Sequence, residues 1–391
     1  MSFDTVIDRR GTGCAKWDAM EKLYGVPADD GLSMWVADMD FPAADFILDA
    51  GRGLIDHGVL GYQSDQSAYL NSIVWWMENR HGWSVKPEEI FTTVGLVNAV
   101  GLCLQTYTLP GDEIVLFTPV YHAFAKVIKA AGRQVKECLL VRDDAGSYHM
   151  DFDAYDGQMT GAEKMAIFCS PHNPGGRIWT VDEQKALAAF AARHNLIVLS
   201  DEIHHDLVFS GQKHAPFAVA APEARDRTVM LTAPSKTFNL AGNHAGQVTI
   251  QDPALRAAFQ GTIAGLGLSS TVFGNAMTAA AYSPKGAAWV DDLVAYIEGN
   301  VAIFEEGVNA VPGLRMMSMQ STYLAWVDFS GTGMGREDFT RRVTEGARIA
   351  PNYGPTFGTG GETWLRFNLG TQRARVEEAT ARLAAAFADL Q

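Results

Sequence analysis

The sequence predicts an α/β protein with a large domain built on a mostly parallel sheet and a smaller α+β unit. The first observation is a series of short, largely continuous apolar runs, which suit strands buried on both faces. The second is a stretch between two of these runs in which apolar residues recur at the spacing of an α-helix. The third is a change of pattern in the last third of the chain. The predicted strands of the large domain are Glu113–Pro119, Ala166–Ser170, Leu196–Ser200, Val229–Ala233 and Gly246–Ile250.

A helix is predicted between the second and third of these runs. Residues 181–195 read VDEQKALAAFAARHN, with apolar residues at helical spacing among good helix formers. Thr180, followed by Asp182 and Glu183, is a suitable N-terminal cap. Strand, helix and strand in this order favour right-handed crossovers and hence a parallel sheet.

The last third of the chain predicts a different unit. Ala287–Val311 has the pattern of one long helix and Arg375–Leu390 that of an amphipathic helix, while Tyr323–Asp328 and Leu365–Leu369 predict strands. The first 45 residues have no strong period and are expected to wrap onto one of the domains. We therefore expect a large domain over residues 46–284 and a small domain formed by residues 1–45 and 285–391.

Composition excludes several classes of protein. The 391 residues include 45 Asp and Glu against 31 Lys and Arg, a net charge of −14, and nucleic-acid binders need the opposite sign. No apolar run approaches 18 residues, so no membrane span is expected. The start of the chain lacks a secretory h-region. The four cysteines are scattered without a CxxC pair, as in reduced cytosolic proteins, so we expect a soluble cytoplasmic enzyme.

Three polar residues follow predicted strands at the edge where open α/β sheets bind ligands. They are Asn173, Asp201 and Lys236. Taken singly, each has a plainer interpretation: a turn residue, a helix cap and a surface lysine. The run DEIHHD (201–206) suggests a metal site through its two histidines. Adjacent histidines on a strand would point to opposite faces, however, and no HExxH motif is present, so no metal is predicted.

The order and spacing of eight stretches identify a family. The chain resembles the fold-type I pyridoxal-phosphate (PLP) enzymes of the class I/II aminotransferase superfamily, most of all the MalY/PatB-like branch of cystathionine β-lyases (C–S lyases). This resemblance implies a seven-stranded large-domain sheet, PLP as cofactor, an amino-acid substrate and a homodimer. The stretches are MWVADMDFP (34–42), GYQ (61–63), TPVYHAF (118–124), SPHNPGGRIWT (170–180), LSDEIHHDLVF (199–209), PSKTFNLAG (234–242), STYLAW (321–326) and WLRFNLG (364–370).

The resemblance implies roles for the residues around the cofactor ring. Lys236 would form the Schiff base with PLP, and once freed it would move the substrate Cα proton. Asp201 would pair with the pyridine nitrogen and keep it protonated, which makes the ring an electron sink. Asn173 and His204 would face the phenolic oxygen, and Tyr121 would stack on the ring. Many relatives have Tyr at the position of His204, and the C–S lyase branch commonly has His.

The phosphate is expected at the turn of Gly95, Leu96 and Val97, which opens a predicted helix over 96–107. Tyr62 resembles the residue that reaches the phosphate of the neighbouring subunit. Two positions depart from the family pattern: Ala233 replaces the usual Ser, and His244 stands where many aminotransferases have Arg. The residues that could compensate are Ser235, Thr232 and His244.

Arg366 matches the family arginine that binds the substrate α-carboxylate. A guanidinium group is well suited to this role because it can form two parallel hydrogen bonds to a carboxylate. Trp35, Ala37 and Tyr323 are expected to line the substrate pocket.

Three functions remain open at this level. A C–S β-lyase would cleave L-cystathionine or a related S-substituted L-cysteine to a thiol, pyruvate and ammonia. A class I/II aminotransferase would use the same lysine and aspartate, and a PLP-binding protein with a regulatory role need not be an active enzyme. The WVADMDFP and GYQ stretches and the EIHHD run favour the lyase, and the complete set of Lys236, Asp201, Asn173 and Arg366 favours retained catalysis.

Overall fold

In the computed structural model, which describes residues 3–143 and 146–390, seven strands form one large sheet in the order β2-β10-β9-β8-β7-β3-β4. Every neighbouring pair from β9 to β4 is parallel, whereas β10 runs antiparallel to both β9 and β2. The predicted mostly parallel, seven-stranded sheet is confirmed. Its strands are β2 (Ile90–Thr93), β3 (Glu113–Thr118), β4 (Gln134–Leu139), β7 (Glu163–Cys169), β8 (Ile197–Asp201), β9 (Thr228–Thr232) and β10 (Gly246–Thr249).

The apolar runs form strands because helices bury both faces of the sheet. In β7, Met165 and Ile167 pack in one core with residues of α5, while Ala166 and Phe168 pack in another core with residues of α8. β4 was not predicted because its sequence, QVKECL, mixes exposed and buried positions, as expected of an edge strand.

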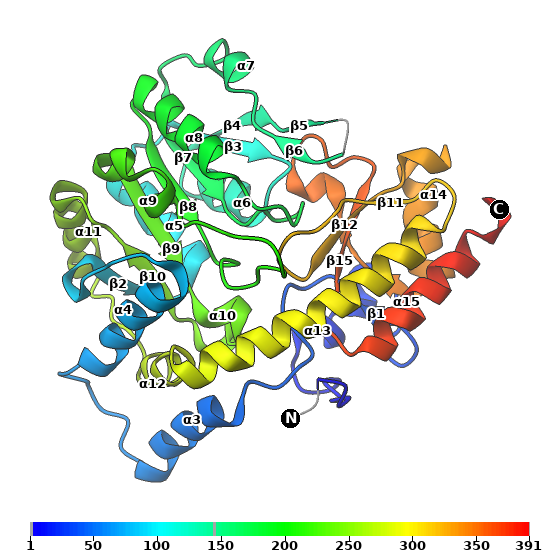
Figure 1. Cartoon of the computed structure of the whole chain (residues 1–391), viewed down its shortest axis with the longest axis horizontal. Coiled ribbons are helices and arrows are strands. Elements are labelled where there is room, and N and C mark those ends of the chain that lie inside the picture. Colours follow the sequence, from blue (N-terminus) through cyan, green and yellow to red (C-terminus); the bar gives the residue numbers. More distant parts are fainter. Residues whose placement is uncertain (1–2, 144–145, 391) are drawn as a thin grey trace.

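Helices cover both faces of this sheet (Figure 1). The cap predicted at Thr180 is confirmed, since its Oγ1 accepts from Glu183 N and the Glu183 carboxylate accepts from Thr180 N. The helices of this part are α3 (Asp45–His57), α4 (Ser67–His81), α5 (Leu96–Tyr107), α6 (Ala123–Ala130), α7 (Phe152–Asp156), α8 (Val181–Arg193), α9 (Phe217–Ala220), α10 (Pro234–Thr237), α11 (Pro253–Gly265) and α12 (Val272–Ala281). A small hairpin joins β5 (Val141–Arg142) to β6 (Tyr148–His149).

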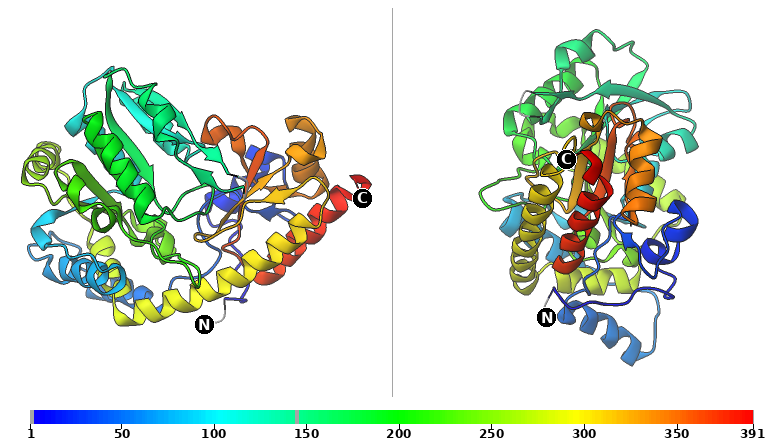
Figure 2. Two further views of the ribbon diagram at one scale, coloured as in Figure 1. Left: turned by 45° about the horizontal axis from the view of Figure 1, so that its top comes forward. Right: turned by 90° about the vertical axis from the view of Figure 1, so that its right-hand side faces the viewer.

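A second unit holds the four-stranded sheet β11-β12-β15-β14. Its long helix α13 runs beneath the large sheet and then alongside α15 (Figures 1 and 2). The N-terminal segment joins this unit, because β1 pairs with β13. Domain edges at 45/46 and 284/285 stay a prediction. The elements are α1 (Ala15–Asp18), α2 (Met20–Tyr24), β1 (Leu32–Ser33), α13 (Pro284–Asn309), β11 (Arg315–Met316), β12 (Leu324–Asp328), α14 (Arg336–Arg341), β13 (Ile349–Ala350), β14 (Asn352–Tyr353), β15 (Trp364–Asn368) and α15 (Arg373–Ala386).

The direction of chain progression reverses between β3 and β7. From β3 the chain adds β4 on one side, and from β7 it adds β8 and β9 on the other. Such a reversal opens a crevice at the carboxyl ends of the strands, where ligands bind in open α/β sheets. Among the described helices, none is long and apolar enough to cross a membrane.

Candidate active site

A cavity lies at this carboxyl edge and gathers most of the residues singled out by the sequence. Chain segments that follow β2, β3, β7, β8 and β9 all contribute to its wall. The predicted residues that line it are Ala37, Gly95, Leu96, Val97, Tyr121, Asn173, Asp201, His204, Ser235, Lys236 and His244. A second cavity, of about 690 Å³, shares Ala37, Tyr121 and Lys236 with the first and adds Trp35 and Arg366. The two cavities therefore adjoin at the lysine, and we call the first the inner cavity and the second the outer cavity.

Lys236 lies in α10, the short helix that follows β9. Its Nζ donates to the Ala37 carbonyl over 2.6 Å. Burial, together with the positive charge of Arg366, lowers the pKa of Lys236 to about 8. The amine is therefore much closer to its nucleophilic, neutral form than an ordinary lysine.

Asp201 ends β8 and is buried, with Oδ1 accepting from Ile203 N over 3.1 Å. Burial raises the pKa of its carboxyl to about 7, with the hydrogen bond and Lys236 opposing the shift. No side-chain cation within residues 3–143 and 146–390 forms an ion pair with it. This buried acid is therefore suited to a cationic N–H on a ligand in the cavity.

Arg366 is buried in the middle of β15 and is held by Asn173 and the backbone. Its Nη1 donates to Asn173 Oδ1 over 3.0 Å and its Nη2 to the Trp35 carbonyl over 2.9 Å. Its Nε has no hydrogen-bond partner, and it forms no ion pair with any acid in the described chain. Burial lowers its pKa to about 10, so it stays charged at neutral pH. A buried guanidinium in this state is suited to a ligand carboxylate.

His204 lies in the cavity wall and packs against Tyr323, which lies behind the wall. The His204 ring meets Tyr323 edge-on, and burial holds the pKa of His204 well below its usual value, so the ring is neutral. The His204 Nδ1 is buried and has no hydrogen-bond partner. Tyr323 is not among the residues that line the cavities, and its hydroxyl donates to the Ala37 carbonyl. Tyr323 thus shapes the pocket through Ala37.

The first turn of α5 forms one end of the inner cavity. Gly95 precedes it at φ 90°, which glycine adopts without strain, and His244 Nδ1 lies 4.0 Å from where a Gly95 Cβ would stand. The Thr232 hydroxyl is buried without a hydrogen-bond partner and does not line the cavity, unlike Ser235 and His244. Helix N–H groups beside a polar imidazole suit a phosphate.

Tyr62 lies outside both cavities of its own chain. Its side chain is fully exposed, and exposed Ile55, Val59 and Leu60 precede it. Solvent exposure of so many apolar side chains in one segment is typical of a surface that another chain covers.

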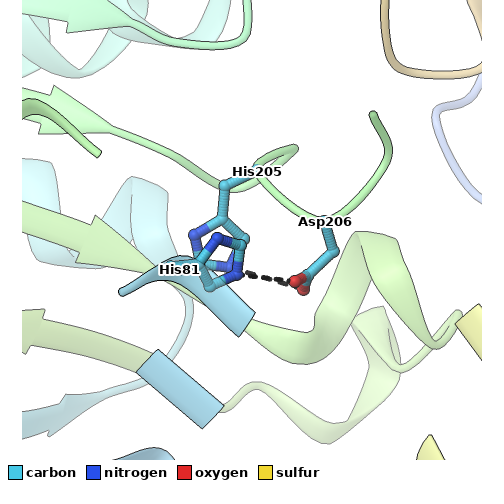
Figure 3. Close-up of side chains that lie close together, drawn as sticks. All are labelled: His81, His205 and Asp206. Carbon is cyan, nitrogen blue, oxygen red and sulfur yellow. Dashed lines mark hydrogen bonds and ion pairs between the residues drawn. The ribbon is translucent and has the colours of Figure 1, made fainter. Parts of the chain in front are cut away.

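A buried network centred on Asp206 was not predicted, and Figure 3 shows three of its members, His81, His205 and Asp206. The Asp206 carboxylate accepts hydrogen bonds from Trp76 Nε1, His81 Nε2 and Thr237 Oγ1, and His205 Nε2 lies 3.4 Å away. Since Thr237 follows Lys236, the network anchors the helix that carries the lysine. Only tertiary packing brings His81, from α4, to this position.

The expectation that His204 and His205 lie on a strand is wrong, because β8 ends at Asp201 and both lie in the turn that follows. They nevertheless face apart, His204 toward the inner cavity and His205 onto the ring of His81, whose centroid is 4.1 Å away. The ligand atoms of His81, His205 and Asp206 all lie within 4.8 Å of one another, close enough for a metal ion, and the Asp206 carboxylate also accepts hydrogen bonds from Trp76 and Thr237. The absence of a metal stays a prediction.

Comparison with known proteins agrees with this geometry. Residues 41–383 match the family model described as aminotransferase class I and II. The chain belongs to this family. It is 37% identical over 389 residues to cystathionine beta-lyase PatB of Bacillus subtilis, covering 99% of this chain and 100% of that protein. It is 31% identical to protein MalY of Escherichia coli, with 97% of each chain covered.

The same fold occurs in a solved structure of a PLP-containing protein. Cystalysin from Treponema denticola, whose crystal structure contains pyridoxal 5'-phosphate, superposes with a TM-score of 0.94 at 32% identity, covering 100% of this chain and 99% of that one. The inner cavity of this class I and II family member fits such a group. It offers an amine, a buried carboxylate, a helix N-terminus and a buried imidazole nitrogen that lacks a partner.

Proposed function

We propose that the protein is a PLP-dependent C–S β-lyase that cleaves L-cystathionine or a related S-substituted L-cysteine. The main support for this proposal is that Lys236 and Asp201 line the same cavity. A second cavity adjoins the first at Lys236 and is lined by Arg366, whose charge has no ion-pair partner in the described chain. The names of the relatives support the choice of reaction, because PatB, at 37% identity, is a cystathionine beta-lyase.

Each part of the cofactor would be bound by a particular side chain of this site. Lys236 would bond covalently to the cofactor aldehyde, and Asp201 would pair with the ring nitrogen. The amide oxygen of Asn173 accepts a hydrogen bond from Arg366. The amide N–H groups of Asn173 therefore remain free to donate to the phenolic oxygen of the cofactor. Tyr121 lines both cavities, where it can cover the ring face, and the first turn of α5, with Ser235 or His244, would hold the phosphate. Bound PLP supplies an electron sink for charge that develops at the substrate Cα.

The remaining residues would bind the substrate and move its proton. Arg366 would hold the α-carboxylate through the N–H groups that the protein leaves unused. The freed Lys236 amine would take the proton from Cα, and the Cβ–S bond would then break with the electron pair leaving on sulfur. A thiol pKa of about 8.5 makes thiolate an adequate leaving group. Water completes the balance, giving one thiol, one pyruvate and one ammonia.

The second candidate is an aminotransferase, because the family includes enzymes of that activity by name. The two functions differ in their need for an acceptor. Purified holoenzyme given L-cystathionine alone should release thiol and pyruvate in equal amounts. Lys236→Ala should abolish both products, and omission of a keto acid should not matter. Turnover that strictly requires 2-oxoglutarate would reject the lyase.

We also infer that the active enzyme is a homodimer in which Tyr62 reaches the phosphate of the neighbouring subunit. Its exposure, with Ile55, Val59 and Leu60 beside it, supports this assignment. The four free cysteines fit a reducing compartment such as the cytoplasm.

A further inference from the structure

The outer cavity is lined by four cationic side chains and, among the described residues, by no carboxylate. The cations are Lys126, Lys129, Lys236 and Arg366. The whole chain carries a net charge of −14, so this local excess of positive charge is not a consequence of composition. A cavity with walls of one sign concentrates ligands of the opposite sign.

Two of these cations have no role in the function proposed above. Lys126 and Lys129 lie three residues apart in α6, so both side chains project from one side of that helix. Both are exposed, and neither side chain has an ion pair or hydrogen bond with any described part of the chain. They are therefore free to bind a ligand anion.

The remaining wall of the outer cavity suits an uncharged linker. Tyr24 and Trp35 line the cavity with their rings 5.3 Å apart, an apolar surface for methylene groups. Burial, and the charges of Arg366 and Lys126, lower the pKa of His122 to about 4, so this ring adds no charge. Its Nδ1 is buried without a hydrogen-bond partner.

We propose that Lys126 and Lys129 form a subsite for a second carboxylate, carried by the sulfur-bearing fragment of the substrate. The proposal rests on the lyase function above and adds a substrate class to it. Arg366 binds the α-carboxylate of the cysteine unit, and the α6 lysines bind the distal carboxylate of the leaving thiol. The enzyme therefore prefers S-carboxyalkyl cysteines, whose distal group is an anion, over uncharged analogues of the same length.

The test compares two substrates that differ in one charge. S-(2-carboxyethyl)-L-cysteine and S-(2-carbamoylethyl)-L-cysteine have nearly the same shape, and kcat/KM is measured for each with holoenzyme. Wild type should prefer the acid, and Lys126→Gln/Lys129→Gln should lower kcat/KM for the acid about fivefold to tenfold, mainly through KM. For the amide, kcat/KM should change less than about twofold, because the uncharged amide does not form the electrostatic interaction that the variant removes.

Matched variants separate a local effect from loss of net charge. Lys185→Gln/Lys213→Gln removes two exposed lysines that do not line the cavity, and it should leave the preference unchanged. Lys126→Glu/Lys129→Glu should reverse the preference in favour of the cationic S-(2-aminoethyl)-L-cysteine. Equal kcat/KM for acid and amide in wild type, or the same loss in both lysine pairs, would overturn the subsite.

A binding measurement keeps the subsite testable if no cysteine derivative is cleaved. Linear dicarboxylates from glutarate to suberate, each with its monoamide, are titrated into holoenzyme by calorimetry. At least one diacid should bind more tightly than its monoamide, and the α6 double Gln variant should lose that difference. Binding of this kind without turnover would reject the lyase and keep the subsite, whereas equal affinities for every pair would reject the subsite itself.

Discussion

At the scale of single residues, burial creates the chemistry of the site. Lys236 and Asp201 are ordinary in sequence, but the cavity lowers the pKa of the amine and raises the pKa of the acid. Both shifts follow from the cost of charge in a low-dielectric site. Sequence spacing placed these residues at strand ends, but it contained no information on their pKa values.

Loading of the cofactor should depend on the protonation of Lys236. Only the neutral amine attacks an aldehyde, and the pKa of Lys236 is about 8, so the rate of PLP binding to cofactor-free protein should rise with pH and level off above about 8. Arg366→Gln removes a positive charge that lowers this pKa, and should move the midpoint to higher pH. Stopped-flow absorbance measures the rate.

Arg193→Gln serves as the control for this pH profile. This arginine is a partly exposed residue of α8 that pairs with Asp156, and its charge does not contribute to the pKa shift of Lys236. If the pH profile of Arg366→Gln had the same midpoint as that of wild type, the charge of Arg366 would not be a cause of the lowered pKa of Lys236.

At the scale of elements, the site depends on how short segments are fixed after each strand. α10 has four residues, too few to be stable as an isolated helix, so its position depends on tertiary contacts. The hydrogen bond from Thr237 to Asp206, with His81 and Trp76 on the same carboxylate, provides such a contact.

Loss of the Asp206 charge should therefore weaken both the fold and the site. Burial opposes ionisation of Asp206, but His205 and His81 outweigh it and hold its pKa well below the usual value, so the group is charged. Asp206→Asn should lower the free energy of unfolding by about 3 kcal/mol, since it breaks a buried ionic network. Urea unfolding at pH 7 measures the change.

A smaller substitution separates the network from the single bond to α10. Thr237→Val removes one buried hydrogen bond and should cost about 1 kcal/mol. It should lower kcat out of proportion to this small loss, because Lys236 is the neighbouring residue. An Asp206→Asn protein as stable as wild type would show that the network does not hold the fold.

At the scale of the whole molecule, two units and a second subunit would complete the site. β15 of the smaller unit supplies Arg366, and the large sheet supplies Lys236 and Asp201. Tyr62 is exposed and lines neither cavity of its own chain, and the proposed dimer would bring it to the other active site.

Mixed dimers can test whether the site is shared. Lys236→Ala and Tyr62→Ala subunits, co-expressed with different tags, should form hybrids in which one site has both native residues. Because about half of randomly paired dimers are hybrids with one intact site, the mixture should recover about a quarter of wild-type activity. Activity no greater than the average of the two parent variants would indicate that Tyr62 acts within its own chain or not at all.

The sequence by itself determined five of the seven strands of the large sheet, the cap at Thr180, the long helix near residue 300 and the family, since these depend on local period and motif order. Tertiary structure alone decided that β10 runs antiparallel, that His81 joins Asp206, and that Lys126 and Lys129 border the same cavity as Arg366. These facts depend on contacts between residues far apart in the chain, where packing and burial, rather than local propensity, set the arrangement and the charge states.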